Sequence, residues 1–184
     1  LAGNTAIRTV LGAAQLAAGQ PEAAIKTLGE AEAIASSPRS RKLLADALTT
    51  VAVGKLAAND AAAAEPLLVR AEQLDPNPAV LRNLGIARLG LDRPIDAMVV
   101  FDRASKADGS SITAMLAARS RAVSGDVAAA RLIYEKALAT ELKAEQVRGN
   151  VVEIALDWAA SELLKGGDPA VAIGALEKAA AHAK

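Results

Sequence analysis

The 184-residue chain has no cysteine, one histidine and only three aromatic residues, a single Trp, Tyr and Phe. Without cysteine it has no disulfide framework, thiolate zinc site or Cys nucleophile, and one histidine cannot supply a His-rich metal site. Lys plus Arg and Asp plus Glu both number 21, so the net charge is zero and gives no electrostatic footprint for DNA or RNA. No run of about 18 uncharged apolar residues occurs, so we expect no membrane-spanning helix.

Alanine is the commonest residue, with 46 copies, and Leu, Glu, Lys, Arg and Gln fill much of the remainder. These are the strongest helix formers, and the β-branched residues never alternate with a period of two over a long run. An apolar content of 52% excludes a disordered tail. The composition therefore predicts an all-α protein.

Five short segments resemble one another and mark the points where helices stop: 19–21, 59–61, 92–94, 125–127 and 167–169. Each begins with a helix-ending or capping residue, and three of the five have proline in third place. Proline suits the first turn of a helix, and Asp or Asn before it caps the free amides. Each segment is predicted to end one helix and start the next.

Alignment on these turns reveals a repeat. In the helix after each turn, small and large residues alternate at offsets of four and three, which places them on one helical face. The columns are Ala24, Ala64, Ala97, Ala130 and Ala172; Leu28, Leu68, Phe101, Tyr134 and Leu176; and Ala31, Ala71, Ala104, Ala137 and Ala179. The helix before each turn carries a small-residue column of Gly12, Ala52, Gly85, Ala118 and Ala160. The spacing of 40, 33, 33 and 42 residues indicates stacked pairs of antiparallel helices.

These residues resemble the tetratricopeptide repeat (TPR) family, through Leu11-Gly12, Leu84-Gly85, the Ala97, Phe101, Ala104 and Ala130, Tyr134, Ala137 series, and Asp75-Pro76. The resemblance covers about residues 5–183, in divergent copies: the family's first-helix Trp is replaced by Arg8, Leu48, Leu81, Ala114 and Leu156. It implies an all-α, right-handed α-solenoid of five helix pairs, about residues 5–36, 38–77, 78–109, 111–141 and 144–183, in one superhelical domain over 1–184. The chain begins at Leu1 rather than Met, so we expect it to be part of a longer protein.

Two insertions account for the longer spacings. Ser37-Pro38 is typical of an N-cap followed by a first-turn proline, which predicts a helix from Pro38 to Ala57. Val147, Val151, Ile154 and Trp158 form one apolar stripe, which predicts a long helix from about Ala144 to Lys165. A break at Gly149-Asn150 is the alternative, because glycine costs roughly 1 kcal/mol against alanine inside a helix.

The sequence offers little for catalysis. Its one histidine, His182, lies three residues from the end, where no partner can orient it as a general base. No phosphate-binding glycine loop and no Glu-x-x-His pair occur, and Gly166-Gly167-Asp168-Pro169 is interpreted as a turn. We expect no enzyme and no cofactor.

For binding, the TPR resemblance implies a concave groove lined by the first helix of each pair. The predicted inner-face residues are Thr9, Ala13 and Leu16; Thr49, Val53 and Leu56; Arg82, Ile86 and Leu89; Met115, Arg119 and Ala122; and Asp157, Ala160 and Leu164. Family members that clamp a peptide's terminal carboxylate use Lys and Asn at places that hold Thr9, Ala13, Thr49 and Val53 here, so the clamp is absent. An apolar groove with two arginines favours a peptide or helix that carries an acidic residue. Alternatively, another part of the parent protein, or a second copy, covers the groove.

One further column, Lys55, Arg88 and Arg121, stands four residues before the turn in three consecutive repeats. It is interpreted either as a basic ladder for an acidic partner or as local charge that complements helix C-termini and is neutralised by Asp60, Asp92 and Asp126. A second basic cluster, Arg39, Arg41 and Lys42, is expected to be a solvated face.

The sequence thus predicts a non-enzymatic protein-interaction module that acts as an adaptor or scaffold. The partner-binding candidates are Thr49, Val53, Lys55, Arg82, Ile86, Arg88, Leu89, Met115, Arg119 and Arg121. The alternatives are a self-associating homo-oligomeric scaffold and a regulatory segment of a larger protein. The composition is compatible with a bacterial cytoplasm and with a periplasm.

Overall fold

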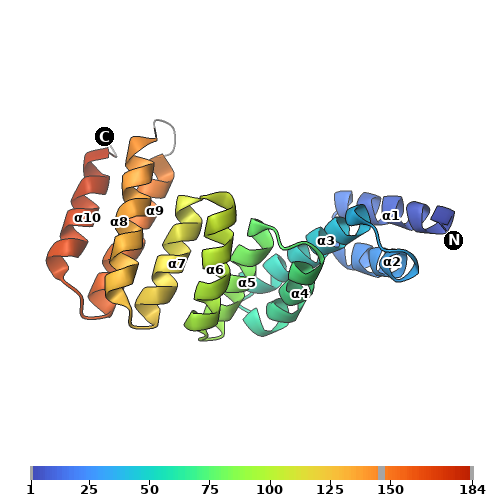
Figure 1. Cartoon of the computed structure of the whole chain (residues 1–184), viewed down its shortest axis with the longest axis horizontal. Helices are drawn as coiled ribbons and strands as arrows, with labels where there is room; N and C mark the ends of the chain where they lie inside the picture. Colours follow the sequence, from blue (N-terminus) through green and yellow to red (C-terminus); the bar gives the residue numbers. More distant parts are fainter. Residues whose placement is uncertain (1, 145–147, 183–184) are drawn as a thin grey trace. The chain divides into compact units, whose positions relative to one another are not determined.

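The computed structural model describes residues 2–144 and 148–182, and these residues form ten α-helices (Figure 1). In chain order the helices are α1 (Ala2–Ala17), α2 (Pro21–Ile34), α3 (Pro38–Ala57), α4 (Ala61–Leu74), α5 (Pro78–Gly90), α6 (Pro94–Asp108), α7 (Ser111–Val123), α8 (Val127–Lys143), α9 (Arg148–Leu164) and α10 (Pro169–His182). The described part of the chain holds no strand, which confirms the predicted all-α class.

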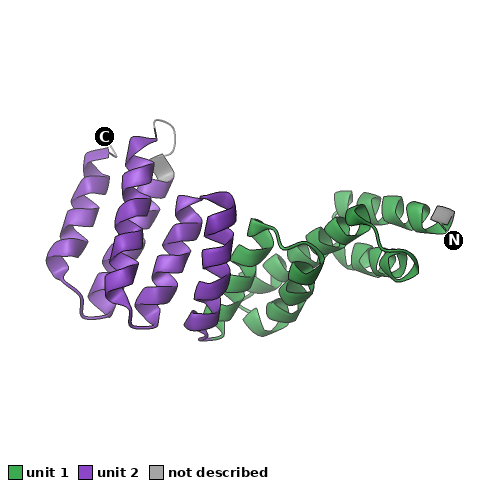
Figure 2. Ribbon diagram, viewed as in Figure 1, with its two compact units in different colours: residues 1–91 green, residues 92–184 purple. Residues whose placement is uncertain are grey.

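The chain divides into two compact units, residues 1–91 and 92–184 (Figure 2). In unit 1, each helix from α1 to α5 packs against the next one along the chain, and in unit 2 the same holds from α6 to α10. The first helices of neighbouring pairs also touch: α1 contacts α3, α3 contacts α5, and α7 contacts α9. Within each unit this is the packing of stacked helix pairs. Continuity of the repeats into one superhelical domain stays a prediction.

The helix starts follow from capping side chains. Ser37 accepts a hydrogen bond from the Ser40 amide at 3.1 Å and Ser40 bonds back to the Ser37 amide, which forms a capping box ahead of Pro38. As a result α3 has the predicted bounds, Pro38–Ala57. The side chains of Asp60, Asn77, Ser110 and Asp126 cap α4, α5, α7 and α8 in the same way.

A left-handed residue lies in the turn between the two helices of each pair. These residues are Gly19, Asn59, Asp92, Gly125 and Gly166, with φ between 56° and 97°. In the first four pairs three residues separate the helices, but four separate α9 from α10. The left-handed residue of the fifth turn is therefore Gly166, so alignment on Gly167 shifts the predicted columns of α9 by one position.

That shift explains one wrong prediction. Ala160 was expected in the buried small-residue column, but it is exposed, and its neighbour Ala159 is 5% exposed. Counted from Gly166, Ala159 occupies the position that Gly12 occupies relative to Gly19. The other four members of the column are buried as predicted.

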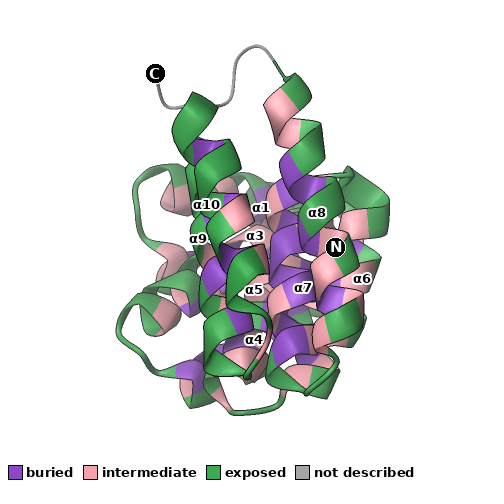
Figure 3. Cartoon of the chain, turned by 90° about the vertical axis from the view of Figure 1, so that its left-hand side faces the viewer, coloured by how far each residue is buried: buried purple, intermediate pink, exposed green. Residues whose placement is uncertain are grey.

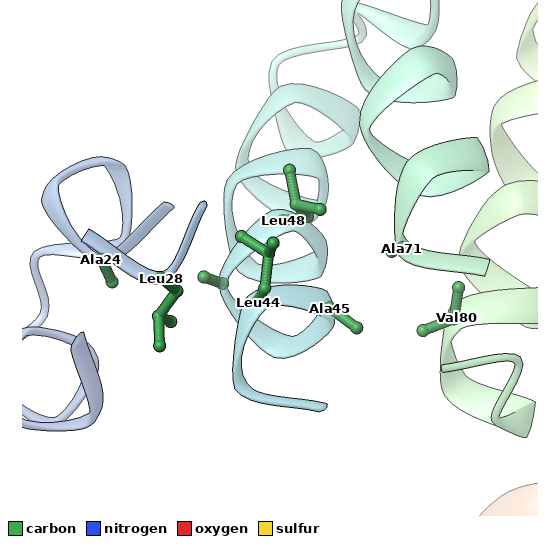
Figure 4. Packing of buried hydrophobic residues seen from close by; sticks show 8 residues of the cluster. Ala24, Leu28, Leu44, Ala45, Leu48, Ala71 and Val80 are labelled. Carbon is green, nitrogen blue, oxygen red and sulfur yellow. The ribbon is translucent and has the colours of Figure 1, made fainter. Parts of the chain in front are cut away.

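The core of each unit consists of the predicted columns. All ten alanines of the two alanine columns are buried, and so are Leu28, Leu68, Phe101 and Tyr134 of the large-residue column. In unit 1, Leu28 joins a cluster with Leu44, Leu48 and Val80 from α3 and α5 (Figure 4). The close approach of α1 and α2 needs Gly12, because a Cβ there would lie 2.7 Å from Leu28 Cδ2. Small residues thus let the helices approach, and one large residue fills the space beside them.

Two predictions concern the C-terminal end of the chain. Leu176 belongs to the large-residue column but was expected, with Ile173, to need a cover if the last helix is exposed; it is 37% exposed, because α10 packs on α9 and no later helix covers its other side in the described chain (Figure 3). The long helix does not begin at Ala144, which instead caps the C-terminus of α8. Helix α9 begins at Arg148 and runs through Gly149-Asn150 without a break, and residues 145–147, which include Val147 of the predicted stripe, lie outside the described residues.

Candidate protein-interaction surface

The candidate surface in unit 1 is the exposed side of α3 and α5, here called the first-helix face. Val53 on α3 and Ile86 on α5 occupy equivalent repeat positions and are 44% and 38% exposed. Since α3 contacts α5, these two apolar side chains come from neighbouring helices of one face. The Thr49 hydroxyl, one turn before Val53, donates to the Ala45 carbonyl at 2.7 Å and is only half-buried.

Arg82 is the arginine of this face, and it also interacts within the chain. It lies four residues before Ile86, which places both on the same side of α5, and it is half-buried. Leu89, one turn after Ile86, is also half-buried. The face therefore combines exposed aliphatic side chains with one arginine.

In unit 2, Arg119 is held by a network that spans three helices. Its Nε donates to Asp157 Oδ1 of α9 at 2.7 Å, and its Nη2 contacts the same oxygen. The Tyr134 hydroxyl of α8 donates to Asp157 Oδ2 at 2.7 Å and lies 2.9 Å from the Ser161 hydroxyl. Burial, reinforced by the negative charge of Asp157, raises the pKa of the Tyr134 phenol far above its ordinary value, so the phenol remains a donor. The predicted groove residue Arg119 thus also joins α7 to α9.

Met115 and Ala122 do not lie on an exposed face. Both are 1% exposed, which corrects the prediction that they line the groove. Helix α7 contacts α6, α8 and α9, so more of its circumference is covered than the helix periodicity alone indicates.

Two members of the predicted basic ladder are paired with carboxylates of a neighbouring helix. Arg88 Nε on α5 lies 3.4 Å from Glu65 Oε1 on α4. Arg121 on α7 forms a bidentate salt bridge with Asp102 on α6: its Nη1 lies 2.9 Å from Oδ1 and its Nη2 lies 2.6 Å from Oδ2. The neutralising carboxylates therefore come from the preceding helix. The aspartates expected in this role act elsewhere: Asp60 and Asp126 are N-caps, and Asp92 is the left-handed turn residue. Lys55, in the last turn of α3, is exposed.

Counted from Gly166, the fifth member of this column is Glu162, a residue that the sequence analysis did not single out. Its side chain is 1% exposed and accepts from Arg131 Nε and Nη2 of α8, both at 2.9 Å, and from Trp158 Nε1 at 3.2 Å. The hydrogen bonds from Arg131 lower the pKa of Glu162 although burial acts in the opposite direction. Arg131 occupies the repeat position of Glu65, so this pair repeats the Glu65–Arg88 pair with its charges exchanged.

The second basic cluster is partly structural. Arg41 donates from Nη2 to the Gln73 carbonyl at 2.7 Å and from Nε to the Leu74 carbonyl at 3.3 Å. These are orphan carbonyls at the C-terminus of α4, which a cation satisfies well. Arg39 and Lys42 are exposed, as expected of a solvated face.

The described residues offer little else for chemistry. His182 is exposed in the last described turn of α10. Within residues 2–144 and 148–182, no group of three His, Asp or Glu side chains is placed to hold a metal ion. None of the helices described is both long and apolar enough to cross a bilayer.

Comparison with known proteins rests on structure, because no family model and no curated protein matches the sequence. The fold is similar to that of YrrB, described as a TPR protein with an unusual peptide-binding site, with a TM-score of 0.68 and 14% identity over 95% of this chain and 84% of that one. It is also similar to MamA, with a TM-score of 0.71 and 16% identity over 99% and 93% of the two chains. A third similar structure is TTC0263, a thermophilic TPR protein of Thermus thermophilus, with a TM-score of 0.54 and 15% identity over 86% and 99%. The chain has the TPR fold, built from divergent copies of the repeat.

Proposed function

We propose that this chain is a non-enzymatic adaptor that binds an apolar peptide or helix of a partner protein on its first-helix face. The observation that carries the proposal is the matched exposure of Val53 and Ile86, on neighbouring first helices of unit 1. Aliphatic side chains presented at equivalent positions of successive repeats can be contacted by one segment of a partner. Arg82 beside them favours a segment that carries a carboxylate.

The proposal draws support from YrrB, a structurally similar protein described as having a peptide-binding site. Of the other predicted residues of unit 1, Thr49 and Leu89 lie one turn from Val53 and Ile86 on the same sides of α3 and α5, whereas Lys55 and Arg88 are two residues away from them and face the opposite sides of these helices. Arg119 contributes in unit 2 through the part of its side chain, 41% exposed, that Asp157 leaves accessible.

The test uses the full chain, immobilised and exposed to a native lysate, with bound proteins quantified by mass spectrometry. The Val53→Glu, Ile86→Glu double variant removes the two exposed apolar contacts. The matched control is Ile95→Glu, Val99→Glu, which places the same charges at exposed positions of a second helix, α6, where the wild-type side chains are 63% and 51% exposed. We avoid reversal of Arg119, because that change would break the pair with Asp157 and confuse folding with binding.

We expect at least one lysate protein to be captured by the wild-type chain and by the control variant but not by the Val53→Glu, Ile86→Glu variant. Its affinity, measured by calorimetry with purified partner, should fall at least about tenfold in the double variant, because burial of a charge against apolar partner atoms costs more than about 1.4 kcal/mol. In Arg82→Glu the affinity should also fall, because the new carboxylate repels the carboxylate of the partner. Equal capture by the double variant and the control would contradict binding on this face.

A second function, self-association, is favoured by the apolar surface of α9 and α10. A cavity of about 340 Å³ there is lined by Val152, Ala155, Leu156, Leu176, Ala179 and Ala180. Leu156 is 57% exposed, and nearby Ile173 on α10 is 56% exposed. If copies associate through this surface, light scattering will show a mass that rises with concentration in wild type and stays monomeric in Leu156→Glu, Leu176→Glu.

A further inference from the structure

Unit 2 contains a concave site of its own, formed by α6, α7 and α8. A cavity of about 570 Å³ opens between α6 and α8, alongside α7. This volume falls within the range of roughly 300–1,000 Å³ that is typical of ligand sites. On α7 it is bordered by Ala114 and Arg121, which lie about 140–160° around the helix from Arg119. The cavity therefore lies on a different side of α7 from Arg119.

The cavity exists because the side chains at its base are small. Ala114 and Ala117 of α7 and Ala137 of α8 leave room between the helices. Leu132 and Ile133 of α8 provide an apolar wall, and Leu132 is 70% exposed. An occupant of this cavity would cover that leucine.

The charge around the cavity is positive. Lys106 of α6 and Lys136 of α8, which lie on its two sides, are exposed. Arg121 and Asp102 also border it, but they neutralise each other through their bidentate salt bridge. The lining thus carries two lysines in excess over carboxylates. Asp108, the last residue of α6, is not part of the lining, and its carboxylate accepts from the Ser110 amide and the Thr113 hydroxyl.

A serine hydroxyl adds a polar group at one end. Ser111, the first residue of α7, lines the cavity and is only 8% exposed. Its hydroxyl makes no hydrogen bond with any residue that the structure describes. Among the described residues, the buried side-chain atoms without a partner are Arg8 Nη1 and Gln15 Oε1, so the Ser111 oxygen is accessible and can bond to an occupant of the cavity.

We propose that this cavity binds an acidic, partly apolar peptide segment of a partner protein. A carboxylate of the segment lies between Lys106 and Lys136, an adjacent aliphatic side chain packs on Leu132 and the alanine floor, and a polar group of the segment bonds to the Ser111 hydroxyl. The charge complementarity favours a carboxylate, and the apolar wall favours a peptide over a free anion. This proposal is independent of binding on the first-helix face.

The test is a titration of the isotopically labelled full chain, followed by amide chemical shifts at about 0.15 M ionic strength, where exposed charges remain effective over about 8 Å. The probe is a blocked hexapeptide of alternating Glu and Leu, and the matched probe has Gln in place of Glu. Inorganic phosphate serves as a third probe, because it tests for a free anion. The variants are Lys106→Glu, Lys136→Glu; the control Lys165→Glu, Lys178→Glu, two exposed lysines of unit 2 outside the cavity; and Ser111→Ala.

We expect the Glu–Leu peptide to shift amides of α7 around Ser111 and Ala114. Its affinity should fall about tenfold or more in the Lys106, Lys136 variant, several-fold in Ser111→Ala and little in the control, since two reversed contacts together change the equilibrium by about a factor of ten. The Gln–Leu peptide should bind correspondingly more weakly.

Three outcomes would overturn the proposal. The first is no shift at peptide concentrations up to about 10 mM, well above the Kd of a minimal millimolar interaction. The second is a set of shifts confined to the region of Val53 and Ile86, which would assign the peptide to the first-helix face and leave the proposed function standing. The third is the same cavity shifts with phosphate and none with peptide, which would make the cavity a site for free anions.

Discussion

The buried pair of Arg131 and Glu162 allows the sharpest prediction about stability. Replacement of Arg131 by Met keeps the aliphatic stem but removes both hydrogen bonds to Glu162, which is 1% exposed. Only the Trp158 indole N–H, at 3.2 Å, would remain as a side-chain donor to that carboxylate. Breaking a fully buried pair costs about 3–5 kcal/mol. Since the Arg131 side chain is 38% exposed and water can replace part of it, we expect unit 2 to lose about 2–3 kcal/mol.

For a unit of roughly 90 residues, this loss corresponds to a fall in Tm of about 10–20 °C. The assay is urea unfolding at pH 7, followed by circular dichroism and by the fluorescence of Trp158, the only tryptophan in the chain. Trp158 donates to Glu162, so its signal reports on this interface. Lys136→Met, which removes an exposed cation from the same helix, is the control.

The pH dependence has a defined sign. In wild type the pKa of Glu162 is lowered, so its contribution to stability is present above the carboxyl's ordinary value of 4.5 and is lost as pH falls through the still lower folded value. Without Arg131, the pKa of Glu162 would lie above its wild-type folded value, because only the hydrogen bonds from Trp158 and the Asp168 backbone would remain to oppose burial. The difference between wild type and Arg131→Met should therefore be largest near pH 7 and shrink as pH falls below 4.5.

A double variant that exchanges the charges of Arg131 and Glu162 provides a second test of this pair. Arg131→Glu, Glu162→Arg reproduces the polarity of the Glu65–Arg88 pair and should recover part of the stability that Arg131→Met loses. The reasoning is refuted if Arg131→Met and Lys136→Met differ by less than about 0.5 kcal/mol at pH 7, the usual range for surface substitutions.

Three further predictions concern the repeat framework, and urea unfolding measures each of them. Gly12→Ala should lower the free energy of unfolding by about 1–3 kcal/mol, because the new Cβ meets Leu28. Leu28→Ala should then lower it less in the Gly12→Ala background than in wild type. Gly19→Ala, at φ 69°, should lower the free energy of unfolding by about 1 kcal/mol, whereas Gly54→Ala, inside α3 with open space around it, should raise it by as much as about 1 kcal/mol. Equal effects of the two substitutions would refute the assignment of the left-handed turn. Ser37→Ala should cost about 0.5–2 kcal/mol through loss of the capping box, and no loss would show that Pro38 alone fixes the start of α3.

Much of the fold was predictable because its rules are local. Alanine at fixed offsets from a turn can lie on only one helical face, so the buried columns around Ala24 and Ala97 followed from spacing alone. The capped start at Pro38 followed from residue type. The fifth turn was less certain in sequence, because Gly166 and Gly167 can both adopt a left-handed conformation, and only the backbone identifies Gly166 as the residue that does.

The candidate surface was predictable only in part. Exposure of Val53 and Ile86 follows from helix periodicity, but burial of Met115 depends on how many neighbours surround α7. The partners of Arg119 and Arg121 lie 38 and 19 residues away, and no spacing rule chooses between one carboxylate and another a turn later. The cavity of unit 2 depends on the distance between α6 and α8, which the sequence pattern does not encode.

The exchanged polarity of the Arg131–Glu162 pair means that the repeats are not interchangeable modules. If the first helix of the third pair replaced that of the fifth, Arg88 would face Arg131, and two cations would meet at a buried position. The equivalent positions on α2 and α6 hold Ile25 and Met98, so this charge matching is confined to the junctions of α4 with α5 and of α8 with α9. At those two junctions, a helix from the other one would bring like charges together, and the order of these repeats therefore depends on charge as well as on covalent connection.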